Sequence, residues 1–221
     1  TNNVTLNLKI TGTITSVDWG DETEITTRLS HTYANAGQYM IKVIGGTTLN
    51  SNILGSASLK DFLSKCYIGS SITTINTSAF ESHNNLKVII FSDSVTNIKS
   101  YAFRDAMQIN IVILPKNLIS MGEYSFGYCS MLQYLIFRKT ETKVDRKNFV
   151  DLYLLKSLNS SKIKSIGNDN FNNAYVLKTI NLPNLTSLDN NFNNAYVLKT
   201  INLPPNLTKI TSSFSNGNIE Q

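Results

Sequence analysis

The sequence has little charge, little proline and only two cysteines. Charged residues make up 16% of the 221-residue chain, and because exposed helices usually display many Glu and Lys, this low content favours a β-rich surface. Two cysteines are too few for a disulfide framework. The chain also lacks the run of about eighteen apolar residues that a membrane-spanning helix needs. The hydrophobic fraction of 41% nevertheless allows a sizeable buried core.

The charge that is present is mild and dispersed. Twenty basic and fifteen acidic residues give a formal net charge of +5. The densest basic stretch, residues 139–147, is interrupted by Glu141 and Asp145. Because nucleic-acid binding needs Lys and Arg gathered in a stripe on one face, we expect no nucleic-acid partner.

Residues suited to catalysis or metal binding are also scarce. One of the two histidines, His31, lies near Ser30, Asp18 and Asp21, a set that contains a nucleophile, a base and an orienting carboxylate. The same two aspartates offer oxygen ligands for Ca²⁺, which needs six to eight of them. A structural role for His31 is favoured over both. No phosphate-binding loop, dinucleotide fingerprint or zinc-ligand spacing is present, and we predict no catalytic residue, no metal and no cofactor.

A repeat of 21 to 23 residues organises most of the chain. Its most regular position is a phenylalanine, found at Phe80, Phe103, Phe126, Phe149, Phe171, Phe192 and Phe214. Apolar residues follow each of the first six at intervals of six and nine, and an apolar pair three residues apart precedes most of them. A half-repeat with Leu63, Cys66 and Ile68 comes first, and the stretch FNNAYVLKTINLP occurs twice, at 171–183 and 192–204.

This spacing predicts one short strand in each repeat, with alternate side chains pointing inward. A single coil cannot bury its own apolar side, so neighbouring coils must stack around one continuous core. The strands then form a parallel sheet with about 4.8 Å between neighbours. The sequence therefore predicts a mainly β solenoid of about seven rungs, built from short parallel strands.

At these positions the sequence resembles the BspA-type leucine-rich repeats of bacterial and some protozoan surface proteins. Ala79-Phe80, Ala102-Phe103 and the run GYCSMLQYLIF at 127–137 carry the resemblance, which covers roughly residues 58–219. It implies a right-handed coil and an extracellular or cell-surface location. The fourth repeat departs from the pattern, with Glu141 in place of the first apolar residue and Ser160 in place of the third strand residue. We expect that coil to be distorted or looped.

Residues 1–47 follow a different pattern, which we interpret as a small antiparallel β cap ahead of a repeat domain at 48–221. The runs VDWGD at 17–21, HTY at 31–33 and AGQYMIKV at 36–43 resemble the PKD-type β-sandwich, in a shortened form. Glu22 stands where that pattern has Gly. A cap would cover the open side of the first coil, which otherwise invites aggregation. After Phe214 the sequence stops before a further strand, and we expect the natural chain to continue beyond Gln221.

The two cysteines fall at core positions of the repeat. Cys66 occupies an inward strand position, and Cys129 lies three residues after Phe126, where other repeats have Ala. We interpret both as small buried thiols, since free Cys is commonly buried.

Outward positions of the strands form columns on the exposed face of the predicted sheet. In the first four rungs these columns are mostly apolar and aromatic, and in the last three they are polar with a basic edge. A contiguous exposed apolar patch usually marks an interaction surface. The candidate partner-binding residues are Tyr67, Val88, Ile90, Ile111, Ile113, Tyr134 and Ile136. Two alternatives remain open, namely that residues 1–57 fold over the patch or that it only reflects β-propensity.

The sequence thus favours a non-enzymatic cell-surface recognition or adhesion module that binds a protein, and the resemblance implies a host or bacterial surface protein as its partner. The first alternative is a structural spacer or self-association module that buries the same patch against a second copy. The second alternative is glycan binding through Tyr67, Tyr134 and neighbouring Asn residues. Direct insertion into a membrane is not expected.

Overall fold

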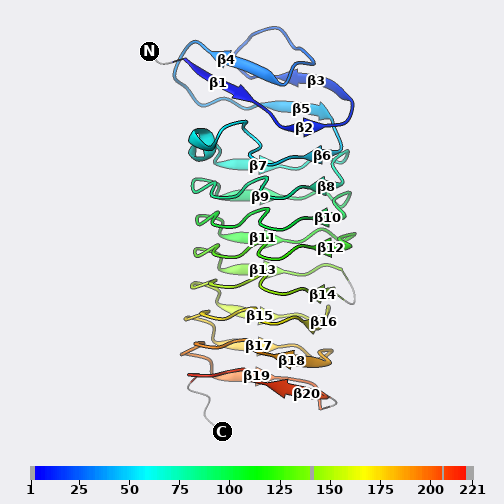
Figure 1. Ribbon diagram of the computed structural model, residues 1–221, viewed down its shortest axis with the longest axis vertical. Coiled ribbons are helices and arrows are strands. Elements are labelled where there is room, and N and C mark those ends of the chain that lie inside the picture. Colours follow the sequence, from blue (N-terminus) through cyan, green and yellow to red (C-terminus); the bar gives the residue numbers. More distant parts are fainter. Residues whose placement is uncertain (1–2, 140–141, 206, 218–221) are drawn as a thin grey trace.

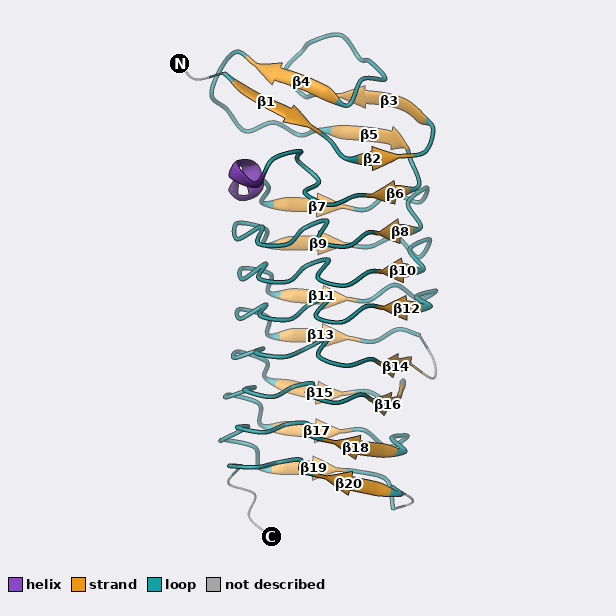
Figure 2. Ribbon diagram, viewed as in Figure 1, coloured by secondary structure: helices purple, strands orange, loops and turns teal. Residues whose placement is uncertain are grey.

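The computed structural model describes residues 3–139, 142–205 and 207–217. Its coils stack along one long axis, with the two ends of the chain at opposite ends of the stack (Figure 1). Short strands and loops make up nearly the whole of it (Figure 2), and the described residues contain one short helix. The mainly β solenoid of about seven turns is therefore confirmed.

Each coil contributes one strand to the same side of the solenoid. The middle residue of each strand points inward, as in Ile89 and Val112, and its two neighbours point outward. Adjacent strands pair in parallel, in register, within two groups, β7 to β13 and β15 to β19. These strands are β7 (Lys65–Tyr67), β9 (Val88–Ile90), β11 (Ile111–Ile113), β13 (Tyr134–Ile136), β15 (Ser157–Asn159), β17 (Thr179–Asn181) and β19 (Thr200–Asn202).

A second strand in each coil, two to four residues long, comes from the apolar pair that the repeat places ahead of its phenylalanine. Ile75, Ile98 and Met121 are its buried residues in three successive coils, and they are neighbours in the ladder. These strands are β6 (Thr48–Leu49), β8 (Thr74–Ile75), β10 (Asn97–Ile98), β12 (Ser120–Met121), β14 (Thr142–Val144), β16 (Ile163–Ile166), β18 (Ser187–Asp189) and β20 (Lys209–Thr211).

The irregular fourth coil is confirmed. Both ladders stop there, because β13 does not pair with β15 and β12 does not pair with β14 within the described residues. The β14–β16 pairing also contains a register shift between Thr142 and Lys143. Ser160 is buried in the place of a larger apolar residue, whereas Glu141 lies outside the described residues.

The first coil is more complete than the predicted half-repeat. Strand β6 pairs in parallel with β8, with Leu49 opposite Ile75, which aligns residues 53 and 54 with Ala79 and Phe80. Ile53 and Leu54, both buried, therefore stand where later coils have Ala and Phe. The short helix η1 (Ala57–Phe62), capped by Ser56, then leads into β7. The periodicity missed this coil because its phenylalanine is replaced and η1 lengthens it.

The repeated phenylalanines form a stacked column through the core. The first six are fully buried, and neighbouring ring centroids lie 4.9 to 5.8 Å apart. The chain turns tightly on both sides of each ring, with left-handed residues such as Asp105 (φ 58°) and Asn173 (φ 61°). Asn and Asp tolerate this region better than other side chains with a Cβ atom.

The N-terminal segment consists of antiparallel pairs. Strand β1 (Val4–Asn7) pairs with β4 (Ser30–Tyr33), and β3 (Ile14–Asp18) pairs with β5 (Lys42–Gly45). Strand β2 (Ile10–Thr11) pairs antiparallel with β6 and so joins the segment to the first coil. Figure 1 shows the segment at one end of the stack, as expected for a cap. The domain division between residues 47 and 48 and the PKD-like character stay predictions.

Candidate functional site

The predicted partner-binding residues lie together on the outer face of one sheet, formed by β7, β9, β11 and β13. Parallel pairing sets Tyr67 opposite Ile90 and Ile113 opposite Ile136. The apolar face is defined by these residues and their exposed fractions: Tyr67 68%, Ile90 50%, Ile111 47%, Ile113 45%, Tyr134 45%, Ile136 46%, and half-buried Val88.

Within the described part of this segment, residues 3–57 do not fold over the apolar face. The N-terminal strands lie beyond the first coil, at the end of the stack (Figure 1). Strand β2 covers the edge of β6, which belongs to the other ladder. The alternative in which this segment shields the patch is therefore wrong, and the apolar side chains face solvent on a rigid sheet.

The remaining part of the face, carried by β15, β17 and β19, is polar. Asn181 donates to the side-chain oxygen of Asn159 at 3.1 Å, and Asn202 donates to that of Asn181 at 2.8 Å. This amide ladder satisfies much of its own hydrogen bonding, as expected for stacked Asn residues. The two parts of the face meet where the Lys156 ammonium lies 5.1 Å from the Tyr134 ring centroid and 3.3 Å from its hydroxyl.

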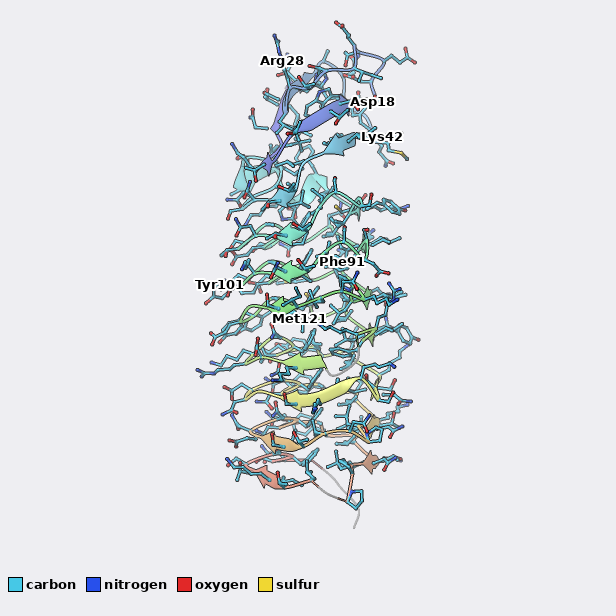
Figure 3. All side chains as sticks on the ribbon, turned by 90° about the vertical axis from the view of Figure 1, so that its right-hand side faces the viewer. Asp18, Arg28, Lys42, Phe91, Tyr101 and Met121 are labelled. Carbon is cyan, nitrogen blue, oxygen red and sulfur yellow. The ribbon has the colours of Figure 1, made fainter. Side chains whose placement is uncertain are left out.

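Side chains of successive coils also stand in columns elsewhere on the molecule, as Figure 3 shows. One column that the sequence reasoning missed is a stripe of stacked tyrosines, Tyr153, Tyr175 and Tyr196, with ring centroids 5.0 and 5.5 Å apart. Each is 37 to 47% exposed. Each of these tyrosines follows a repeat phenylalanine by four residues, and this spacing could have predicted the stripe.

A cleft of about 270 Å³ opens beside the break in the second ladder. Its apolar lining includes the buried residues Leu114, Leu118 and Phe137, and cationic Arg138 and Lys143 lie at its edge. Arg138 is already paired in a two-pronged contact with Asp93, at 2.7 and 3.1 Å. The Lys116 amide and the Arg138 guanidinium together hold the pKa of the Asp93 carboxyl below its usual value. The Arg138 guanidinium therefore already has an anionic partner within the chain.

The histidine near the N-terminus is part of a packed aromatic cluster. His31 Nε2 lies 2.7 Å from Asp21 Oδ2, and the imidazole stacks on Trp19 with centroids 5.0 Å apart. Tyr33 donates its hydroxyl to the Trp19 carbonyl at 2.9 Å. Ser30 and His31 are consecutive residues of β4, so their side chains point to opposite faces and cannot form a nucleophile–base pair. The contacts of His31 are those of a structural residue.

The turn beside this cluster keeps a glycine-like backbone. Glu22 adopts φ 66°, the left-handed region that favours Gly. The Thr23 hydroxyl donates to Asp21 at 2.7 Å, and this bond is the main cause of a lowered pKa for the Asp21 carboxyl. Within the described residues, no group of three or more His, Cys, Asp or Glu side chains is placed to hold a metal ion.

Cys129 and the second histidine are fully buried, as expected for core groups, whereas Cys66 is half-buried and packs against the core. Cys66 and Cys129 are free, and burial raises the pKa of the Cys66 thiol to about 12. Cys129 donates to the Phe103 carbonyl at 3.2 Å. His83 is fully buried at the position where other coils have Ala or Cys, and burial lowers the pKa of its imidazole. Burial also raises the pKa of the Cys129 thiol, and a raised pKa disfavours the reactive thiolate form of both cysteines.

No helix in the described part of the chain is long and apolar enough to cross a membrane.

The fold has relatives among solved structures. A leucine-rich repeat protein from Eubacterium ventriosum superposes with a TM-score of 0.71 at 22% identity, over 84% of this chain and 50% of that one. The chain thus spans half the length of that relative. A leucine rich cell surface protein from Faecalibacterium prausnitzii gives a TM-score of 0.43 at 15% identity, over 80% of this chain and 63% of that one. No curated protein sequence matches.

The repeats themselves identify the family. Six copies of the BspA type leucine rich repeat region match at residues 52–173 and 149–221, which is most of the chain. The matched residues are those that form the two ladders and the phenylalanine column. The chain belongs to the family of BspA-type leucine-rich repeat proteins.

Proposed function

We propose that the chain is a non-enzymatic recognition or adhesion module of the cell surface, which binds a protein partner through the apolar face. One observation carries this proposal. Six large apolar side chains, each 45 to 68% exposed, stand in adjacent rungs of one sheet. Soluble proteins rarely leave such a contiguous patch uncovered unless another molecule binds there. The cell-surface location is supported by the family and by a solved neighbour described as a cell surface protein.

The sheet presents these side chains in a form suited to binding. Cross-strand hydrogen bonds fix the backbone, and the parallel register aligns the side chains in two columns. A rigid surface loses little conformational freedom when a partner docks, so more of the contact energy appears as affinity. Tyr67 and Tyr134 add large side chains with few rotatable bonds and a polar tip, of the type enriched at binding interfaces.

The test replaces three residues of the apolar face, Ile90, Ile113 and Tyr134, with Ser. Binding to immobilised matrix proteins and to intact host and bacterial cells is then compared with that of the parent chain. If these residues anchor the partner at about 2 kcal/mol each, even one replacement weakens binding by about thirtyfold. Circular dichroism verifies the fold, which should persist because all three side chains lie outside the core.

A matched control replaces three exposed apolar residues away from the face, Ile25, Met40 and Ile119, with Ser. Unchanged adhesion by the face variant, or equal loss in the control, contradicts the proposal.

The same patch would also serve a second copy of the chain. Light scattering over a range of concentrations separates the alternatives, because self-association through the apolar face gives a mass that rises with concentration and falls in the face variant. A strictly monomeric parent chain excludes self-association. A glycan array tests the remaining alternative, sugar binding around Tyr67 and Tyr134.

A further inference from the structure

The polar part of the face carries a charge pattern separate from the apolar patch. Lys156, Lys178 and Lys199 occupy one position in three successive coils, immediately before β15, β17 and β19. All three side chains are exposed. We call them the lysine ladder. None of the outward positions of the seven strands of this sheet side, nor the position just before each of them, holds Asp or Glu.

Backbone hydrogen bonds hold the ladder in register. The Lys178 amide donates to the Lys156 carbonyl at 3.1 Å, and the Lys199 amide donates to the Lys178 carbonyl at 3.0 Å. The three Cα positions are therefore spaced by about one strand separation, roughly 4.8 Å. The contact of Lys156 with the Tyr134 ring shows that side chains at this position reach the outer face of the sheet.

The carboxylates of this half of the molecule are engaged elsewhere. Asp169 pairs with Arg146 at 3.3 Å, and Asp189 lies 3.6 Å from the Lys209 ammonium. Asp151 accepts a hydrogen bond from Asn173. Within the described residues no ion pair involves Lys178 or Lys199, so the like charges of the ladder face solvent without neutralisation.

Polar groups that suit sugar hydroxyls flank the ladder. Thr179 and Thr200 are exposed on the next column, and the amides of Asn159, Asn181 and Asn202 form the column beyond it. The backbone groups of β17 are already used in pairing with β15 and β19, so a peptide strand cannot add across the middle of this sheet. The outward positions of β15, β17 and β19 are all Ser, Thr or Asn, so these strands present no outward apolar side chain for a peptide to pack against.

We propose that the polar half binds a linear anionic polysaccharide lying along the long axis of the solenoid. A carboxylate or sulfate on successive sugar units would meet one ammonium per coil, while the Thr and Asn columns hydrogen-bond to the sugar hydroxyls. A repeating ligand suits a repeating surface, because each added coil contributes the same contact. This site uses different residues from the apolar face and does not depend on the function proposed there.

The test measures binding of four polymers by calorimetry at low and physiological salt. Heparin carries sulfates, polygalacturonate carries carboxylates, polyglutamate is an acidic peptide, and dextran is a neutral polysaccharide. We expect heparin or polygalacturonate to bind, polyglutamate to bind at least about tenfold more weakly, and dextran not to bind. Salt should weaken the interaction, because neutralised anions release their counterions. Which of the two anionic polysaccharides binds more tightly identifies the anionic group.

The variant with Lys178→Gln and Lys199→Gln should lose affinity about tenfold or more and show a shallower salt dependence. Its matched control, with Lys9→Gln and Lys42→Gln, removes the same charge from exposed positions in the N-terminal segment. Equal losses in both variants overturn the proposal, because they indicate attraction to net charge alone. Equal or tighter binding of polyglutamate, or no binding of either polysaccharide, overturns it as well.

Discussion

We predict that a Phe→Ala change in the middle of the phenylalanine column destabilises the fold much more than the same change at its end. Phe103 is fully buried, with Phe80 stacked at 5.0 Å, Phe126 stacked at 4.9 Å and Phe91 at 5.6 Å edge-on. A buried Phe→Ala change usually costs about 3–5 kcal/mol. Three aromatic neighbours, each contributing roughly 0.5–1.5 kcal/mol, place Phe103→Ala in the upper part of that range, at about 4–5 kcal/mol.

Phe214 occupies the same repeat position in the last coil but is only partly buried. Its ring stacks on one neighbour, Phe192, at 5.5 Å. The Phe214 side chain buries less apolar area than that of Phe103, and its site is partly open to solvent. Phe214→Ala should therefore cost about 1–2 kcal/mol. Since domains of this kind are stable by about 5–15 kcal/mol, the first change removes a large share of the stability and the second a small one.

Urea unfolding followed by circular dichroism measures both changes, with the slope of the transition checked for constancy. Phe103→Leu is the matched control, and it should lose less than Phe103→Ala because Leu leaves a smaller cavity. Equal losses for Phe103→Ala and Phe214→Ala would refute the reasoning, because they would mean that neither the deeper burial nor the additional ring contacts of Phe103 contribute to stability.

Two further predictions concern buried polar groups. The neutral His83 imidazole has its pKa lowered by burial, so below its ordinary value of 6.5 the unfolded chain binds a proton that the folded chain does not. The free energy of unfolding should therefore fall as the pH drops from about 6.5 towards the folded pKa. His83→Ala should reduce this pH dependence in unfolding measured from pH 7 to pH 5. An unchanged pH dependence in the variant would mean that other groups cause it. Tyr33→Phe removes the buried bond to the Trp19 carbonyl and should cost about 1 kcal/mol, measured by the fluorescence of the single tryptophan; an unchanged midpoint would show that the bond contributes nothing.

The spacing of the repeat was enough to predict which strand residues point inward and which point outward. The intervals between Phe80, Phe103 and Phe126 placed the inward strand residues, such as Ile89 and Val112, and their exposed neighbours. This succeeds because a solenoid repeats one packing environment in every coil, so each position is sampled several times. The exposure of the apolar face followed from the same alternation.

The parts that the sequence could not predict are those that break the repetition. Coil one has Ile53 and Leu54 in place of Ala and Phe and contains η1, so no interval marked it. The left-handed turns around each ring were not foreseen either, because some are held by Asn or Asp and others by residues such as Tyr101 (φ 61°). Which edge β2 would cover depends on a non-local pairing that no local pattern encodes.

The break at the fourth coil coincides with the change from the apolar to the polar half of the face. Both ladders are interrupted there, but the phenylalanine column continues, with Phe126 and Phe149 at 5.8 Å. The Phe126 amide still donates to the Asn148 carbonyl at 3.1 Å. The core therefore joins the two halves, while the outer face lacks the regular strand pairing that would fix one register across both.

On that face the Lys156–Tyr134 contact spans the junction. Ladder hydrogen bonds are what align side-chain columns between neighbouring strands. The side-chain columns of β7 to β13 therefore need not align with those of β15 to β19 for each part of the face to bind its own partner. One solenoid of this construction has room for two unlike ligands, an apolar protein surface on one half and an anionic polymer on the other, held at a fixed separation by a shared aromatic core.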